Sequence, residues 1–235
     1  MTTQTCCPVV ELRQYTLVPS GREVLISLFE QHFIESQEAT GMTVIGQFRD
    51  LNNPDRFVWL RGFGDMASRA RQLEEFYGGP VWKEHREAAN ATMIDSDNVL
   101  LLRPARTNSG FRLENLKRAS DANQQDSNGL VVATIYHLGG STHGEFLEFF
   151  EYERTSPGAL ILATFVTENH PNTFPALPVR EGVNVFVSFS LFADRRTYER
   201  FVNSRGKEAV EKLLLLTKEA PEVLLLAPTA RSLVR

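Results

Sequence analysis

The chain has 235 residues, of which 25 are Lys or Arg and 29 are Asp or Glu, so its formal net charge is −4. A weakly acidic chain without a Lys/Arg run argues against nucleic-acid binding. The hydrophobic fraction of 42% is that of an ordinary globular protein. No stretch approaches the 18 apolar residues of a membrane span.

The two cysteines, Cys6 and Cys7, are adjacent. Sequence neighbours make poor disulfide partners, and two cysteines are too few for a zinc site. The N-terminus has neither a basic start nor an apolar run, so no signal peptide is visible. The sequence therefore predicts a cytoplasmic protein with free thiols, without a metal site and without a membrane span.

Hydrophobic patterning in the first half predicts four strands and three helices. Residues 57–63 alternate large aromatic and charged side chains with Val58 and Leu60, as in a strand buried on both faces. Asp65 is a typical N-cap, Ser20 and Glu23 form a possible capping box, and Pro80 suits the first turn of a helix. In chain order we predict strands at 9–15, 42–49, 57–63 and 99–103, and helices at 20–41, 65–77 and 81–93. The order βαββαβ is that of a ferredoxin-like unit.

The same order begins again after a polar segment. Tyr136-His-Leu138 is similar to Tyr15-Thr-Leu17, and Val223-Leu-Leu-Leu-Ala-Pro228 is similar to Val99-Leu-Leu-Leu-Arg-Pro104. Asp194 follows the strand 186–192 as Asp65 follows the strand 57–63, while Thr142 and Glu145 supply another possible capping box. These landmarks predict a tandem duplication, with repeat 1 at 1–105, an exposed linker at 106–129 and repeat 2 at 130–235.

Two such repeats predict an α+β fold in which the sheets pack face to face. The helices of one βαββαβ unit cover a single face of its sheet, so the other face needs a partner. We expect the two ferredoxin-like repeats to form an intramolecular dimeric α/β barrel, a pseudo-dimer in which neither half folds well alone. A further homodimer is left open.

The first half resembles the NIPSNAP family, which belongs to the dimeric α/β-barrel superfamily. The residues that carry the resemblance are Val9-Val-Glu-Leu-Arg-Gln-Tyr-Thr-Leu17, Pro19-Ser-Gly21, Gly46-Gln-Phe48, Phe57-Val-Trp-Leu-Arg61 and Trp82 in Pro80–Arg86. The second half departs from this pattern, with Ser188 in place of Trp59 and Ser190 in place of Arg61. The superfamily includes cofactor-free monooxygenases, haem enzymes, isomerases and small-ligand binders, so the resemblance leaves the activity open.

The strand faces suggest where a ligand binds. If Val10, Leu12, Val58 and Leu60 pack under the helices, the alternate side chains point into the barrel. We then predict a pocket for a small apolar or acidic molecule in repeat 1, with Arg13, Tyr15, Trp59 and Trp82 contacting the ligand. The alternative is a structural network in which Glu11 pairs with the buried arginines.

Three function classes fit this pattern. The first is a cofactor-free enzyme of oxygenase or isomerase type, with His85 as base and Arg61 as electrostatic clamp. The second is a non-catalytic binder of a small ligand or of haem held by a histidine. The third is a structural protein with a filled barrel. Because Ser188 and Ser190 replace an aromatic and a charged residue, we expect the second half to be a scaffold without a site.

Overall fold

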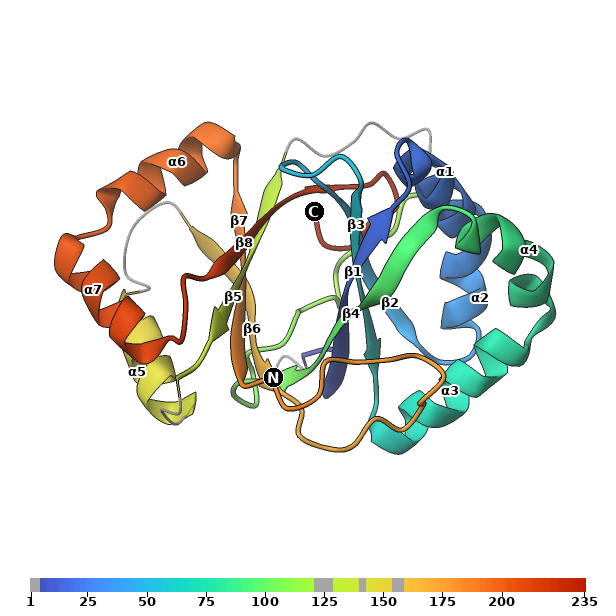
Figure 1. Ribbon diagram of the computed structural model, residues 1–235, viewed down its shortest axis with the longest axis horizontal. Helices are drawn as coiled ribbons and strands as arrows, with labels where there is room; N and C mark the ends of the chain where they lie inside the picture. Colours follow the sequence, from blue (N-terminus) through green and yellow to red (C-terminus); the bar gives the residue numbers. More distant parts are fainter. Residues whose placement is uncertain (1–4, 121–128, 140–142, 154–158) are drawn as a thin grey trace.

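The computed structural model describes residues 5–120, 129–139, 143–153 and 159–235. Eight strands form a closed antiparallel barrel in the order β1-β3-β2-β8-β5-β7-β6-β4. Helices cover the barrel on two opposite sides, those of the first half on one side and those of the second half on the other (Figure 1). The predicted α+β barrel is therefore confirmed.

Each half contributes four consecutive strands with helices between them. The first half comprises β1 (Val9–Leu17), α1 (Gly21–Leu28), the π-helical turn η1 (Phe29–Phe33), α2 (Ile34–Glu38), β2 (Thr43–Asp50), β3 (Arg56–Phe63), α3 (Met66–Gly78), α4 (Pro80–Asn90) and β4 (Met93–Pro104). The second half comprises β5 (Leu130–His137), α5 (His143–Glu153), β6 (Leu160–Thr167), β7 (Val185–Phe192), α6 (Arg195–Ser204), α7 (Lys207–Leu216) and β8 (Glu222–Pro228). The β2–β8 and β4–β6 pairs join the two sheets into one barrel.

Local sequence signals explain several helix starts. The Asp65 carboxylate accepts a hydrogen bond from the Ser68 backbone N–H at 2.6 Å, and Asp194 accepts one from Thr197 at 2.7 Å. Both predicted N-caps are confirmed. The capping box at Ser20 is wrong, because this residue has a φ of 67° and its side chain makes no capping bond. The capping box at Thr142 lies outside the described residues.

The interior of the barrel is apolar and draws on both halves. Its core includes Val10, Leu12, Val58, Leu60, Leu100, Leu102, Val131, Ala133, Val187, Phe189, Leu224 and Leu226. The prediction that Val10, Leu12, Val58 and Leu60 face the helices is therefore wrong. Period-two alternation separates the two faces of a strand but does not say which face meets the helices. The polar set lies under the helices because only these helices offer polar partners.

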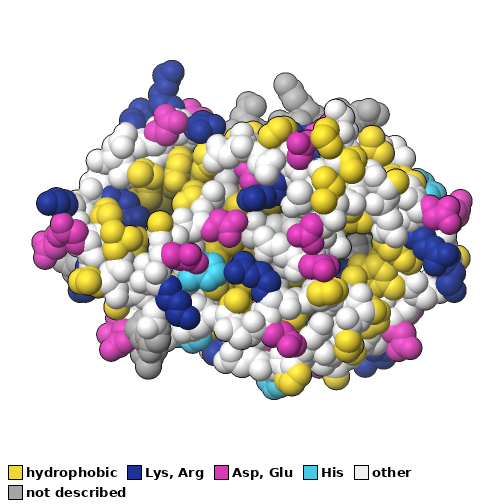
Figure 2. All heavy atoms as spheres, viewed as in Figure 1, with side chains coloured by type: hydrophobic (Ala, Val, Ile, Leu, Met, Phe, Trp, Pro, Cys, Tyr) yellow, Lys and Arg dark blue, Asp and Glu magenta, His cyan; other side chains and the backbone are white. Residues whose placement is uncertain are grey.

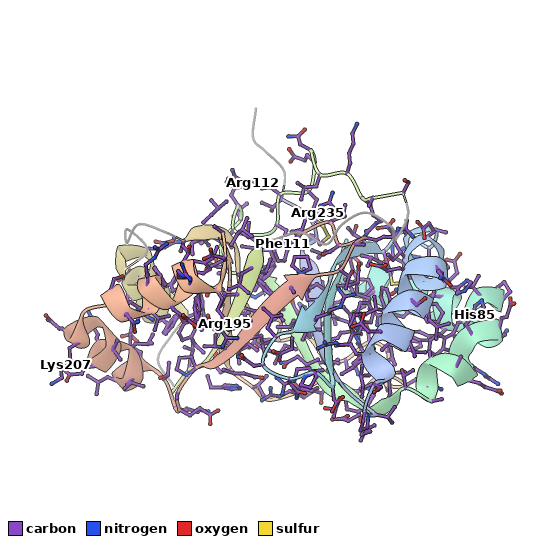
Figure 3. The ribbon with its side chains drawn as sticks, turned by 90° about the horizontal axis from the view of Figure 1, so that it is seen from above. His85, Phe111, Arg112, Arg195, Lys207 and Arg235 are labelled. Atoms are coloured by element: carbon purple, nitrogen blue, oxygen red, sulfur yellow. A yellow bond between two sulfur atoms is a disulfide. The ribbon has the colours of Figure 1, made fainter. Side chains whose placement is uncertain are left out.

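The segment after β4 takes part in the core, against the expectation of an exposed linker. Phe111 is 2% exposed and its ring lies 5.1 Å from that of Phe189 inside the barrel. Val234, close to the C-terminus, belongs to the same core. Phe111 and the C-terminal Arg235 lie near each other (Figure 3) and line a common surface hollow. The segments that follow β4 and β8 thus help to fill the barrel.

Three smaller findings complete the fold. Cys6 and Cys7 form a disulfide, which contradicts the expectation of free thiols. The expected linker, residues 106–129, lies between β4, which ends at Pro104, and β5, which begins at Leu130. Among the described helices none has the length and apolarity to cross a membrane.

Candidate functional site

The first half contains a buried ion network centred on Glu11. The Glu11 carboxylate accepts hydrogen bonds from Arg13 Nη1 at 2.7 Å, Arg61 Nε at 2.7 Å and Arg69 Nε at 2.6 Å. All four residues are fully buried. Burial by itself would raise the pKa of Glu11, but the charges of Arg61, Arg13 and Arg69 outweigh it and hold the pKa well below its usual range. Glu11 is therefore a permanent carboxylate.

The arginines have further partners on the surrounding elements. Arg13 Nε donates to the Tyr15 hydroxyl at 2.9 Å, and Arg61 Nη1 donates to Gln37 Oε1 at 3.1 Å. The Arg61 guanidinium also lies 5.0 Å from the centre of the Trp59 ring, a cation–π distance. The structure thus contains the paired network that the sequence offered as an alternative to a pocket. The predicted contacts of Arg13, Tyr15 and Trp59 with a ligand stay predictions.

Little free space remains beside this network. A cavity of about 30 Å³ lies between β3 and the helices of the first half. It is lined in part by Tyr15, Trp59, Tyr77 and Trp82. A drug-sized ligand needs roughly 300 Å³ or more, so the first half has no room for a substrate of that size.

His85 lies on α4, at the outer edge of the molecule (Figure 3). Its ring stacks on that of His32 with a centroid distance of 3.8 Å and packs edge-on against Phe33 at 6.3 Å. These contacts are those of a half-buried packing residue. The catalytic roles predicted for His85 and Arg61 stay predictions.

The second half contains a larger cavity between its sheet and its helices. The cavity has a volume of about 180 Å³. It is lined by Val132, Thr134, Tyr136, Phe149, Phe150, Ala159, Ile161, Ser188, Ser190, Phe192, Tyr198, Phe201, Val202, Arg205, Leu213, Pro221 and Val223. Hydrophobic side chains gather on the viewed face over the space between α6, α7 and this sheet (Figure 2, left). The walls are apolar and aromatic, and a few polar atoms lie among them.

The strand register explains why this half is hollow. In the first half Glu11 pairs with Arg61 and Arg13 pairs with Trp59 across β1 and β3. At the corresponding places across β5 and β7, Val132 pairs with Ser190 and Thr134 pairs with Ser188. Four long side chains of the first half thus have shorter counterparts in the second, and all four counterparts line the cavity.

The frame around these positions is similar in both halves. Tyr15 pairs with Phe57 in the first half, and Tyr136 pairs with Phe186 in the second. The expectation that the second half is a scaffold without a site stays a prediction, although this half contains the cavity. Short uncharged side chains at these positions leave space under the helices of the second half, whereas long and charged side chains fill the first half. The small side chains of Ser188 and Ser190 were the sequence signal for a cavity.

The polar groups of the cavity converge on one side chain, Tyr136. Its hydroxyl is hydrogen-bonded to the Ser188 and Thr134 side chains, and the residue is 4% exposed. Burial raises the pKa of Tyr136, so its phenol is neutral and can donate at pH 7.

Arg205 is the single charged residue of the lining among the residues that the structure describes. Among the residues with described positions it has no ion-pair partner, in contrast to every arginine of the Glu11 network. The residue is half-buried, and its charge partly opposes the rise that burial causes in the pKa values of Tyr136 and Tyr198. The cavity therefore combines apolar walls, a neutral phenol and an unpaired cation.

The residues around the cavities do not suit haem or a metal. No histidine lines either cavity within the part of the chain that the structure describes. Over the same residues, no group of three or more His, Cys, Asp or Glu is placed to hold a metal ion. Haem also needs far more space than the cavities provide, because drug-sized ligands already occupy roughly 300–1,000 Å³.

Comparison with known proteins places the first half in a family. Residues 10–108 match the model of the NIPSNAP family. This half is a NIPSNAP domain. The resemblance carried by the motifs of β1, β3 and α4 is confirmed, and the NIPSNAP domain is the half that holds the Glu11 network. No curated protein sequence matches the chain.

Solved structures share the fold of the whole chain. A protein from Lactobacillus acidophilus, provisionally named a monooxygenase, aligns with a TM-score of 0.59 and 15% identity over 95% of this chain and 94% of its own. A protein of the same provisional name from Fusobacterium nucleatum has a TM-score of 0.59 and 10% identity, covering 97% and 95%. An anthrone oxidase-like protein aligns with a TM-score of 0.55 and 13% identity over 97% of this chain and 94% of its own. At these identities the likeness concerns the fold.

Proposed function

We propose that the protein binds a small aromatic or apolar acid in the cavity of its second half. The observation that carries the proposal is the cavity itself, which joins apolar walls to a phenol donor and to Arg205, an arginine without an ion-pair partner among the described residues. Few polar groups in an otherwise apolar pocket are typical of sites for small molecules, because the polar groups orient the ligand. A guanidinium is well suited to a carboxylate.

The size of the cavity limits the ligand to about one ring. An engineered cavity of about 150 Å³ in another protein binds benzene. The cavity here, of about 180 Å³, has space for a six-membered ring with one small substituent. The proposed ligand class is therefore that of benzoate, phenol or a cycloalkane carboxylate.

The names of the structural neighbours suggest oxygenase chemistry, but we propose binding without a reaction. No carboxylate or histidine lines the cavity among the described residues, so acid–base work there would fall to the Tyr136 phenol. The neighbours are described as a monooxygenase and as anthrone oxidase-like, and these words support a small cyclic ligand. We also propose that the two halves arose by duplication, since they share one order of elements.

Calorimetric titration with benzoate and with phenol tests this proposal. We expect Ser190→Leu to abolish the binding of both ligands, because the larger side chain fills the cavity. We expect Arg205→Gln to weaken benzoate by about tenfold, as for a lost charge-assisted hydrogen bond, and to change phenol by less than about twofold.

The matched control is Arg196→Gln, which removes an exposed charge from the same helix region. Benzoate affinity in this variant should equal that of the wild type. If Arg196→Gln weakens benzoate as much as Arg205→Gln does, the effect is one of overall charge. If Ser190→Leu binds both ligands normally, the cavity is not the site.

A further inference from the structure

The ion network of the NIPSNAP domain contains more positive than negative charge. Arg13, Arg61 and Arg69 surround Glu11, and all four side chains are fully buried. At neutral pH this group has a local charge of about +2, because arginine stays protonated and Glu11 stays ionised. Burying uncompensated charge is unfavourable, so such a cluster favours a nearby anion.

The tyrosine beside the cluster does not supply the missing negative charge. The Tyr15 hydroxyl accepts a hydrogen bond from Arg13 Nε. Burial raises the pKa of Tyr15, and this effect exceeds the opposing influence of Arg13. Tyr15 therefore remains a neutral phenol at pH 7, and the excess positive charge of the network persists.

The small cavity of about 30 Å³ lies directly against this network. Trp82 is one of five lining residues with a side-chain nitrogen or oxygen atom, and the other four each contact an arginine of the cluster. These residues are Tyr15 with Arg13, Gln37 with Arg61, Tyr77 with Arg61 and Trp59 with both arginines. A water molecule needs about 10–15 Å³ on this scale, so one small ion or a group of two or three atoms fits.

Two buried donors, one on the cavity wall and one in the network beside it, lack an acceptor among the described residues. The indole Nε1 of Trp59 and Nη2 of Arg61 are both without a hydrogen-bond partner among the described residues. Trp59 is 2% exposed and Arg61 is fully buried. Leaving a buried donor unpaired costs about 1–3 kcal/mol, and more for a charged group. An acceptor in the cavity would satisfy such donors.

We propose that this cavity binds a small monovalent anion, a halide or a carboxylate of the size of formate. The net charge of the cluster selects an anion, and the unpaired indole N–H gives it a hydrogen-bond donor. The volume excludes sulfate, phosphate and the ring-sized ligands of the second half. This site is separate from the cavity proposed above and does not rest on that proposal.

Tryptophan fluorescence reports on this site alone. The chain has two tryptophans, and both line the cavity. Titration with sodium bromide should quench their fluorescence in a saturable way and raise Tm. Sodium sulfate at matched ionic strength should not quench the fluorescence, since sulfate is too large for the cavity. Formate, which does not quench by the heavy-atom effect, should compete with bromide and restore the fluorescence.

A pair of variants identifies the donor. Trp59→Phe removes the unpaired N–H and leaves Trp82 as reporter, and we expect at least about tenfold weaker bromide binding. Trp82→Phe leaves Trp59 and the arginines in place, and its affinity should stay within about twofold of the wild type. Equal affinities in the two variants would overturn the proposal.

Bromide-soaked crystals of the wild-type protein give a measurement that does not depend on the variants. An anomalous peak inside this cavity, beside Trp59, is the expected result. Quenching that rises linearly without saturation, or crystals with no anomalous peak at this place, would show that the cavity holds water only and would overturn the proposal.

Discussion

The two halves of the molecule share one arrangement of strands and helices, but the first is filled by side chains and the second contains a cavity. In both, a four-stranded sheet turns one face to the shared barrel and the other to its helices. Under the helices of the NIPSNAP domain, Glu11, Arg13, Trp59 and Arg61 fill the space; under those of the second half, Val132, Thr134, Ser188 and Ser190 leave it open. Four positions on two paired strands thus separate a packed network from a cavity.

This difference also separates stability from binding. Long side chains that hold one another by charge–charge hydrogen bonds fix the helices of the first half onto their sheet. The second half gives up these contacts and retains aromatic residues around a space of ring size. We therefore expect substitutions in the first half to act mainly on stability, and equivalent substitutions in the second half to act mainly on ligand affinity.

The largest effect should follow from Glu11→Gln. This change leaves three buried arginines without their common carboxylate, and breaking a buried ion pair costs about 3–5 kcal/mol of unfolding free energy. Urea unfolding at pH 7 measures the loss. Glu23→Gln is the control, because Glu23 also pairs with an arginine, Arg49, but is 59% exposed. The control should lose less than about 1 kcal/mol.

The same variant predicts a pH dependence. The pKa of Glu11 is lowered in the folded protein, whereas an unfolded glutamate titrates near pH 4.3. A lowered pKa adds stability that is complete above about pH 4.3 and is lost as the pH falls toward the folded pKa. The difference between wild type and Glu11→Gln should thus be constant from pH 5 to 8 and narrow below about pH 4. A difference that stays the same at pH 3 would contradict the network.

The next largest effect should come from exchanging the residues at one equivalent position. Trp59→Ser removes a buried ring from the first half, and we expect a loss of about 3–5 kcal/mol. Ser188→Trp adds a ring to the second half, where it enters existing space, and we expect a loss of less than about 3 kcal/mol. Thermal and urea unfolding compare the two.

Measuring benzoate binding to the same two variants gives a second test of this comparison. Ser188→Trp should abolish benzoate binding, because the indole occupies the cavity. Trp59→Ser should leave it unchanged, because the first half does not contribute to that site. Equal losses of stability, or benzoate binding that depends on Trp59, would contradict the division of roles between the halves.

The smallest effect concerns the hydrogen bond between Ser188 and Tyr136. Ser188→Ala removes one partner of a buried phenol, so we expect a loss of about 1 kcal/mol. Ser190→Ala is the matched control on the same strand face and should lose less than about 0.5 kcal/mol. A Ser190→Ala variant that is as unstable as Ser188→Ala would show that the bond to Tyr136 is not what stabilises this side of the cavity.

The sequence allowed the fold to be predicted more fully than the site. The alternation in β1 and β3, the N-caps at Asp65 and Asp194 and the repeated landmarks at Tyr15 and Tyr136 are local signals, and they led to the barrel. Which face of each strand meets the helices could not be predicted from the strand sequence alone. It depended on Gln37 and Arg69, which lie on helices and meet Glu11 and Arg61 in the folded chain.

The wrong assignment of the strand faces also determined where a site was expected. Because Arg13 and Arg61 were expected to line a pocket inside the barrel, Ser188 and Ser190 were interpreted as the absence of a ligand site in the second half. Short side chains at these two positions leave a cavity only if this face of the sheet packs against the helices. The role of Phe111 was missed for a similar reason, since a lone aromatic residue in a polar segment gives no periodic pattern, and its partners Phe165 and Phe189 are distant in sequence.

The most direct test of the division between the halves is to locate a ring-sized ligand in the wild-type protein. Crystals soaked with 4-bromophenol mark the ligand by the anomalous signal of bromine. We predict a single peak inside the second half, between Ser188, Ser190 and Phe201. A peak beside Trp59 and Trp82 or within the barrel, or no ordered ligand at saturating concentration, would contradict the account.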